Sequence, residues 1–322
     1  MPAIGFICPD KEKVTFQECF TECRLKADLP CGRCKALPFL RKVSLQREWT
    51  GEPSTTQLIG GTREAWLKIT RPFFINPEDR VFALLGTQVH GVLEKFGKGD
   101  NFTEERLRDE ICSGAFDFYD GESETLFDYK TWGSYKVAQA LGIKSIDVPM
   151  FDDNGNPVLF KSGKNKGLPK TKKEYIYGDA VTKTIGIFET SIQMSNYRDK
   201  LKEILPNGYS VKNMAIQIIS RDSGLMVSAI RKIEERAPLI SVNGISKHWI
   251  DRYLQRKRDL LFEALEQDVS PLCRKRDRWY GRKCLNYCDV KEQCQGIGGW
   301  ESEIFLSEKM AEDTEESLSA VA

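Results

Sequence analysis

The chain has 322 residues, of which 40% are hydrophobic and 30% are charged, and these proportions exclude wholesale disorder. The net charge is only +1, so a nucleic-acid surface can arise only from local clustering of basic residues. The first ten residues lack a basic segment followed by a long apolar run, and no apolar stretch reaches membrane-spanning length. We therefore expect a cytoplasmic protein with no signal peptide and no membrane partner.

Residues 1–45 form a cysteine-rich segment. In a reducing compartment, clustered cysteines indicate metal ligands rather than disulfides. We predict a zinc site here, made from Cys8, Cys19, Cys23 and one of Cys31 or Cys34. The alternative is that these are ordinary buried thiols. Cys112, which stands alone in the middle of the chain, is expected in the core.

Residues 50–62 are predicted to form a loop, because glycine, proline, serine and threonine dominate them. A helix follows. Asn76-Pro77 provides an N-cap and a proline at the first helical position, and Gly97 ends the helix. Its apolar stripe, with His90 beside it, consists of Phe82, Leu85, Val89, Leu93 and Phe96.

A β-hairpin is predicted from the alternation in residues 116–119 and 126–131, with Asp-Gly between them. Side chains alternate faces along a strand, so Asp128 and Lys130 share one face and Phe127 and Tyr129 share the other. Asp117 on the first strand can join the charged patch, with the aromatic side chains packing behind it. Two carboxylates suit Mg²⁺ or Mn²⁺, and a lysine can orient water or stabilise developing negative charge. A solvated hairpin face is the alternative reading.

Residues 145–180 look like an irregular excursion from the core with many lysines, which either line a DNA channel or lie on a solvated loop. A helix is predicted over about 187–204. Strands are expected at Met214–Ser220 and Leu225–Ile230, joined by a turn at 221–224. A long basic helix over about 246–267 follows, and the tail from 301 to 322 is acidic and expected to be disordered.

Four features occur in a fixed order: His90 on a helix, Gly-x-x-Asp117, Asp128-x-Lys130, and a helix bearing Gln193-x-x-x-Tyr197. This order resembles the RecB-like branch of the PD-(D/E)xK nucleases, which includes the CRISPR-associated and phage RecB-like exonucleases and the AddB nuclease domain. The resemblance implies a restriction-endonuclease-like α/β core over residues 46–267, with a mixed central sheet flanked by helices. The lysine-rich insertion at about 145–180 departs from simpler relatives, which have a short connection there.

The resemblance also implies roles for these residues. The ligands of a catalytic Mg²⁺ or Mn²⁺ would be His90, Asp117, Asp128 and the backbone carbonyl of Tyr129. Lys130 would be the catalytic lysine. Gln193 and Tyr197, one helical turn apart and so on one face, would hold the lysine, the water or the DNA backbone.

Residues 268–300 contain the second cysteine group, spaced Cys273-x10-Cys284-x3-Cys288-x5-Cys294. It is similar to the group that holds a 4Fe–4S cluster in iron–sulphur RecB-like nucleases, although the gap between Cys284 and Cys288 is one residue longer than usual. Four thiolates could equally hold Zn²⁺. In the family the fourth cluster ligand often precedes the core, so Cys31 or Cys34 could replace Cys273.

The basic helix is expected to bind DNA phosphates through Lys247, Arg252, Arg256 and Lys257, with Trp249 and Tyr253 available for stacking on bases. The predicted function is a metal-dependent DNA exonuclease or endonuclease acting on single strands or DNA ends, in repair, recombination, phage or CRISPR adaptation, where other proteins of those pathways would be partners. The alternative is a non-catalytic, metal-stapled DNA-binding or adaptor subunit with the same fold. A redox iron–sulphur protein is a third reading, although nothing resembles a flavin or nicotinamide site.

Overall fold

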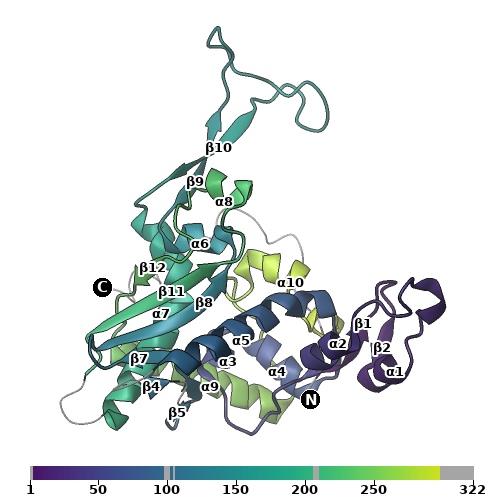
Figure 1. The fold of residues 1–322 in the computed structure, drawn as a ribbon, viewed down its shortest axis with the longest axis vertical. Helices are drawn as coiled ribbons and strands as arrows, with labels where there is room; N and C mark the ends of the chain where they lie inside the picture. Colours follow the sequence, from purple (N-terminus) through teal and green to yellow (C-terminus); the bar gives the residue numbers. More distant parts are fainter. Residues whose placement is uncertain (1–2, 98–101, 104–105, 206–209, 298–322) are drawn as a thin grey trace.

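The computed structural model describes residues 3–97, 102–103, 106–205 and 210–297. It is a mixed α/β fold around a five-stranded sheet with the order β12-β11-β8-β7-β4 (Figure 1). The central strands β8 (Thr125–Trp132) and β11 (Asn213–Ser220) are parallel, whereas β7 (Phe118–Asp120), β12 (Leu239–Ser241) and β4 (Phe102–Thr103) pair with their neighbours in antiparallel fashion. The predicted mixed sheet and the hairpin of β7 and β8 are confirmed.

A 25-residue helix, α7 (Ala180–Ile204), packs against this sheet. Asp179 caps it by accepting a hydrogen bond from the backbone N–H of Thr182 at 2.7 Å, so the helix begins earlier than residue 187. Buried side chains of α7, including Met194 and Leu201, pack with Ile216 and Ile218 of β11. Helix α6 (Ser134–Ala140) adds to the same core.

A second hydrophobic core lies among the helices α2 (Leu37–Ser44), α3 (Thr55–Ile59), α4 (Thr62–Thr70) and α9 (Lys247–Gln267). The N-terminal strand β1 (Ala3–Ile7) joins it by pairing with β2 (Lys13–Thr15) on one side and β3 (Phe73–Ile75) on the other, and α1 (Phe16–Thr21) follows β2. The cysteine-rich N-terminal segment therefore shares a sheet with the chain that follows α4.

Two predicted elements are wrong. Residues 55–59 form helix α3 instead of a loop, because Ser54 and Gln57 make a reciprocal capping box, a helix signal that the turn-forming composition conceals. Residues 226–230 form the helix α8 (Met226–Ile230) instead of a strand. A short apolar run cannot distinguish strand from helix by periodicity, and here β12 occupies the place beside β11.

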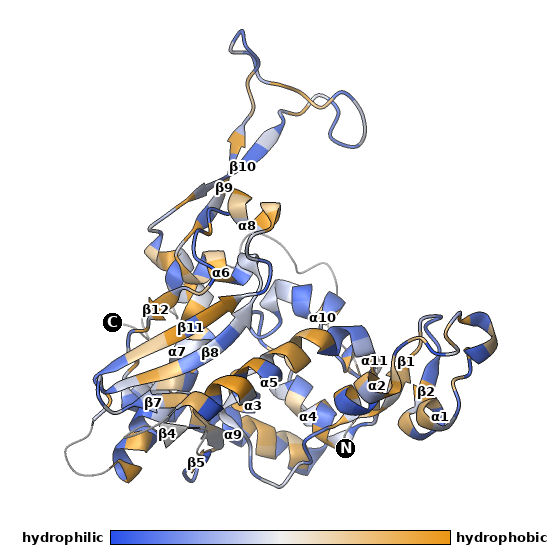
Figure 2. Cartoon of the chain, in the orientation of Figure 1, coloured by the Kyte–Doolittle hydropathy of each residue, from blue (hydrophilic) through white to orange (hydrophobic). Residues whose placement is uncertain are grey.

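The helix that carries His90 is α5 (Val81–Leu93), which follows a 3-10 turn (Pro77–Arg80) capped by Asn76 as predicted. Its apolar stripe lies largely outside the core. None of its residues is buried, and Phe82 and Leu85 are 57% and 42% exposed. Figure 2 shows α5 as an apolar helix along most of its length. It lies across β8 and presents much of its apolar surface to solvent.

The excursion after α6 is confirmed as a projection from the rest of the molecule (Figure 1). It starts and ends as a regular hairpin of β9 (Lys144–Pro149) and β10 (Thr171–Ile176), which pair over six residues each.

The remaining short elements are β5 (Arg106–Arg108), β6 (Ser113–Ala115), α10 (Arg282–Asn286) and α11 (Lys291–Gly296). The predicted acidic tail lies outside the described residues. Within the described ranges, no helix is both long and apolar enough to cross a membrane.

Candidate active site

The structure brings His90, Asp117 and Tyr129 into direct contact. One carboxylate oxygen of Asp117, Oδ2, accepts a hydrogen bond from the backbone N–H of Tyr129 at 2.6 Å. The other, Oδ1, lies 3.2 Å from Nδ1 of His90. Asp117 directly precedes β7, where Phe118 pairs with Phe127, so its carboxylate extends the β7–β8 pairing by one side-chain hydrogen bond. His90, Asp117 and Tyr129 therefore meet at the end of the β7–β8 hairpin where Asp117 precedes β7.

Side chains of β8 alternate between two different environments. The Tyr129 ring makes an edge contact with the His90 ring on α5, with the ring centroids 6.0 Å apart. Thr131 shares that face, since a Cβ at Gly86 of α5 would lie only 3.3 Å from the Thr131 hydroxyl. The prediction that the aromatic side chains pack behind the charged ones is wrong for Tyr129. It lies on the α5 side, whereas Asp128 is among the buried residues.

Asp128 and Lys130 form an ion pair, with the Lys130 ammonium 2.7 Å from Oδ2 of Asp128. Burial is the largest influence on Asp128 and raises the pKa of its carboxyl to about 6, opposed by Lys130 and reinforced by the nearby Asp117. For Lys130, burial alone would lower the pKa, but the carboxylates of Asp128 and Asp117 raise it on balance.

Tyr197 and Gln193 of α7 lie at the same site, as predicted. The Gln193 amide donates to the Tyr197 hydroxyl at 3.3 Å, and burial raises the pKa of Tyr197 to about 12, with the Asp128 carboxylate adding to the rise. Tyr197 also packs against Gly114, where a Cβ would lie 2.5 Å from the hydroxyl. Gly114 opens the Gly-x-x-Asp117 pattern, and its missing side chain leaves room for the Tyr197 ring, a contact that sequence reasoning did not predict.

Carboxylates and an imidazole are donor types that bind divalent metal ions, but the described residues do not hold them in the arrangement of a metal site. Among the described residues, no three His, Cys, Asp or Glu side chains are gathered closely enough to form a ready-made metal site. Oδ2 of Asp128 is buried and contacts the Lys130 ammonium, and Asp117 is bound to His90 instead of to an ion. A metal would have to replace the contact between His90 and Asp117. Binding of the metal by the Tyr129 carbonyl stays a prediction.

The C-terminal cysteines line one cavity together. Cys273, Cys284, Cys288 and Cys294 all border it, together with Arg63 and Glu64 of α4. Gly61, at the start of α4, makes room for this packing, since a Cβ there would lie 2.5 Å from the Cys273 sulphur. Burial raises the pKa of Cys284 to about 11 and that of Cys288 to about 12, so these thiols are protonated until a metal displaces the protons. Four thiols around one cavity fit Zn²⁺ or an iron–sulphur cluster once drawn together.

The N-terminal cysteines are separate from that cavity. Burial raises the pKa of Cys19 to about 11, and the neighbouring thiols of Cys34, Cys8 and Cys23 raise it further. Cys31 is exposed. Cys34 therefore belongs with the N-terminal group, which favours Cys34 over Cys31 as its fourth member and Cys273 as the fourth member of the C-terminal group. Cys112 is buried, as expected, where it contacts Thr55 and Lys200.

The basic helix α9 offers fewer contacts for DNA than the sequence predicted. Lys257 is buried, bonded to Asp277 at 2.9 Å and to the Gly60 carbonyl at 2.6 Å, so its prediction as a DNA contact is wrong. It lies on the face of α9 that packs against α4. Lys247 is paired with Asp251 at 2.9 Å.

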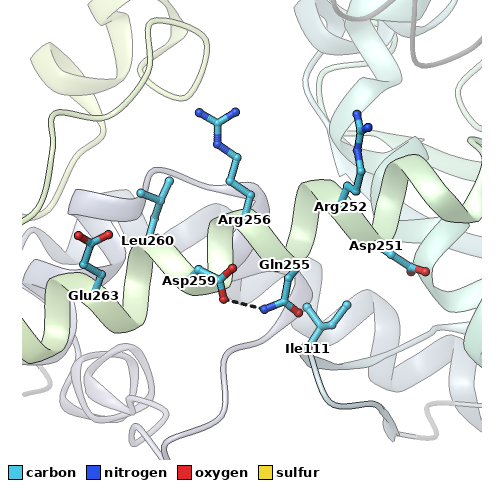
Figure 3. Close-up of a pocket in the computed structure, with 8 residues that line it drawn as sticks. All are labelled: Ile111, Asp251, Arg252, Gln255, Arg256, Asp259, Leu260 and Glu263. Atoms are coloured by element: carbon cyan, nitrogen blue, oxygen red, sulfur yellow. Dashed lines mark hydrogen bonds between the residues drawn. The ribbon is translucent and has the colours of Figure 1, made fainter.

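Arg252 and Arg256 remain exposed on α9 and line a surface groove together. Figure 3 shows their guanidinium groups extending to the same side of the helix, away from Gln255 and Asp259. The neighbouring rings of Trp249 and Tyr253 stack on each other, with centroids 5.0 Å apart. Each ring therefore covers one face of the other, and that face is closed to a base.

Comparison of the chain with family models, curated proteins and solved structures finds no match. The functional argument therefore depends on the arrangement of the residues themselves.

Proposed function

We propose that the chain is a metal-dependent DNA nuclease of the PD-(D/E)xK type that hydrolyses phosphodiester bonds in single strands or at DNA ends. The observation that carries this proposal is the linked group of His90, Asp117, Asp128 and Lys130 at the end of the β7–β8 hairpin. The two acids and the lysine come from one local hairpin, and the imidazole is brought to it by α5. An ion pair with a purely structural task would not need all four of these residues.

Each residue would have a distinct task. Asp117, Asp128 and His90 would hold Mg²⁺ or Mn²⁺, which when bound polarises a phosphoryl oxygen and makes water a better nucleophile. The Lys130 ammonium, held by Asp128, would orient the attacking water and stabilise the negative charge that develops on the phosphate. Tyr197 would keep its proton at neutral pH and donate a hydrogen bond to the phosphate backbone, with Gln193 fixing its hydroxyl.

The cysteine groups would act as structural metal sites that cross-link parts of the chain. We propose that Cys273, Cys284, Cys288 and Cys294 hold a 4Fe–4S cluster or Zn²⁺ that fixes the C-terminal segment to α4, and that Cys8, Cys19, Cys23 and Cys34 hold Zn²⁺. Arg63 adds to the first of these links, because its guanidinium donates a hydrogen bond to the Ser270 carbonyl at 2.6 Å. No redox step is needed for hydrolysis. Anaerobically purified protein with broad visible absorption would indicate the cluster, and colourless protein with bound zinc would exclude it.

The test of the nuclease proposal uses end-labelled single-stranded and duplex DNA with Mn²⁺. The wild-type protein should degrade linear strands, and Asp128→Asn should lower the rate at least about 100-fold. Asp28→Asn, the same change at an exposed site in the N-terminal segment, should keep wild-type activity. A covalently closed single strand should resist cleavage if the protein needs DNA ends. Activity that survives Asp128→Asn would refute the proposed site.

The same experiment distinguishes the adaptor alternative. An adaptor subunit would bind DNA with and without the Asp128 carboxylate but would cleave neither linear nor closed strands with Mn²⁺ or Mg²⁺. The ion pair between Asp128 and Lys130 supports the enzyme, because burying both charged groups costs free energy that simple packing would avoid.

A further inference from the structure

The projecting hairpin ends in a defined structure, and we call residues 144–176 the arm. Beyond β9 and β10, the Met150 N–H donates to the Lys170 carbonyl at 2.9 Å, and the Val158 N–H donates to the Met150 carbonyl at 2.8 Å. The Phe160 N–H and the Leu168 carbonyl then close a loop at 3.0 Å. The tip therefore divides into two loops, which Figure 1 shows pointing in different directions.

The two loops differ in charge. The first, residues 151–157, contains Asp152 and Asp153 and no lysine. From residue 154 to residue 173 the chain contains no acidic residue and six lysines, namely Lys161, Lys164, Lys166, Lys170, Lys172 and Lys173. The second loop, residues 160–168, which we call the basic loop, carries three of these. In a chain with a net charge of +1, this is a pronounced local concentration of positive charge.

The lysines of the basic loop have no structural task that the described residues reveal. Lys161, Lys164 and Lys166 are exposed, and within the described ranges no carboxylate lies within ion-pairing distance of them. The pairs found on the arm lie nearer its base, between Lys172 and Glu174 and between Lys144 and Asp179. Three unpaired ammonium groups on one short loop repel each other, and a polyanion would relieve that repulsion.

The base of the arm is fixed to the protein. Tyr175 on β10 packs against the core of the central sheet, and the Tyr177 hydroxyl donates to the Lys232 carbonyl beyond α8. The Lys144–Asp179 pair ties β9 to the start of α7, the helix that carries Tyr197. Six residues of β-strand span about 20 Å, so the basic loop is held well away from the sheet.

We propose that the arm is a second nucleic-acid contact, in which the basic loop binds the phosphate backbone of the strand whose end is hydrolysed at Asp128. The inference rests on the proposed nuclease function. Ammonium groups on flexible stems bind phosphates without reading the base sequence, so the contact is non-specific and sensitive to salt. Its effect is to hold a long strand near the site between successive cleavages.

The test measures binding of a fluorescently labelled single strand of about 30 nucleotides by anisotropy, over a series of salt concentrations, in EDTA so that cleavage does not intervene. The triple variant Lys161→Gln, Lys164→Gln, Lys166→Gln should bind more weakly. The slope of log affinity against log salt should be about 2 units shallower, since each phosphate contact contributes about 0.7 for a single strand. The matched control is Lys26→Gln, Lys42→Gln, Lys202→Gln, which removes the same charge elsewhere and should keep the wild-type slope.

Several outcomes would overturn the arm proposal. The first is a wild-type slope of log affinity against log salt in the arm variant. The second is an equal loss of DNA affinity in the control variant. The third is no DNA binding by the wild-type protein. Binding of the basic loop to vesicles containing an anionic lipid, without any effect on DNA, would assign it to membranes instead. Hydrolysis of a small chromogenic phosphodiester with Mn²⁺ should be equal in wild type and arm variant. If that hydrolysis is absent while the slope still changes, the nuclease proposal fails and the arm remains a nucleic-acid contact.

Discussion

His90 and Asp117 share a hydrogen bond that joins α5 to the start of β7, with Nδ1 and Oδ1 3.2 Å apart. This bond is the largest influence on His90, and it raises the pKa of the imidazole above its usual value. The contact stabilises the protonated form, so its contribution to stability is complete below the ordinary histidine pKa of about 6.5 and is lost as the pH rises through the higher folded value.

Metal binding should therefore tighten as the pH rises, because Mn²⁺ must displace the proton from His90. We expect the Mn²⁺ affinity, measured by calorimetry, to increase from pH 6 to pH 8, by about tenfold per pH unit below the folded pKa. His90→Asn should flatten this dependence. His248→Asn removes the other histidine, exposed on α9, and should leave it unchanged. An equally steep dependence in His90→Asn would show that another group controls it.

Removing the lysine of the buried pair should destabilise the protein. In Lys130→Gln the Asp128 carboxylate stays buried without its counter-charge, so we expect a loss of about 3 kcal/mol in the free energy of unfolding at pH 7, measured by urea denaturation. The double variant Lys130→Gln, Asp128→Asn should recover most of that loss, because no charge is then left unpaired. A double variant no more stable than Lys130→Gln would contradict this account.

Gly114 should tolerate no side chain, because a Cβ there would overlap the Tyr197 ring and hydroxyl. We expect Gly114→Ala to cost about 1–3 kcal/mol in the free energy of unfolding and to lower nuclease activity with the displacement of Tyr197. Gly91→Ala in α5 is the matched control. A Cβ at that position meets nothing within 4 Å, so it should be neutral or stabilising by up to about 1 kcal/mol. Equal effects at both glycines would refute the role of Tyr197 packing.

Glu64 should make the protein sensitive to acid. Burial raises the pKa of this carboxyl, but Lys68 and Lys283 outweigh burial and hold it at about 2. A depressed folded pKa contributes stability above the unfolded value of about 4.5, and that stability is lost as the pH falls towards 2. The loss is at most about 3 kcal/mol. Glu64→Gln should reduce the slope of unfolding free energy against pH in this window, whereas Glu174→Gln, at the half-exposed pair with Lys172, should not.

Metal removal should separate the two cysteine groups. Cys284→Ser should lower the metal content of the purified protein and its melting temperature, because Cys284 is buried at the cavity beside α4. Cys31→Ser should change neither, since Cys31 is exposed and is not one of the proposed ligands. The measurement is elemental analysis with thermal denaturation before and after chelation. An equal loss of metal in the two variants would contradict the assignment of ligands.

Local signals predicted the elements that position the site. The Asp-Gly turn and the alternation around it gave the hairpin, and helical spacing brought Gln193 and Tyr197 to one face. Local signals could not predict which face of β8 is covered. Asp128 is buried although it is charged, because α7 covers its side of β8, and that burial depends on contacts far along the chain. The prediction that Lys257 contacts DNA was wrong for the same reason, because its partner Asp277 lies beyond the end of α9.

Helix α5 carries His90, and none of its side chains is fully buried, although Leu84 packs against the helical core. Elements with few buried apolar contacts open at a small fraction of the global unfolding free energy. Asp128 and Lys130, in contrast, lie on a central strand of the sheet. We therefore expect local opening of α5 to separate His90 from the site while the acid and the lysine stay in place.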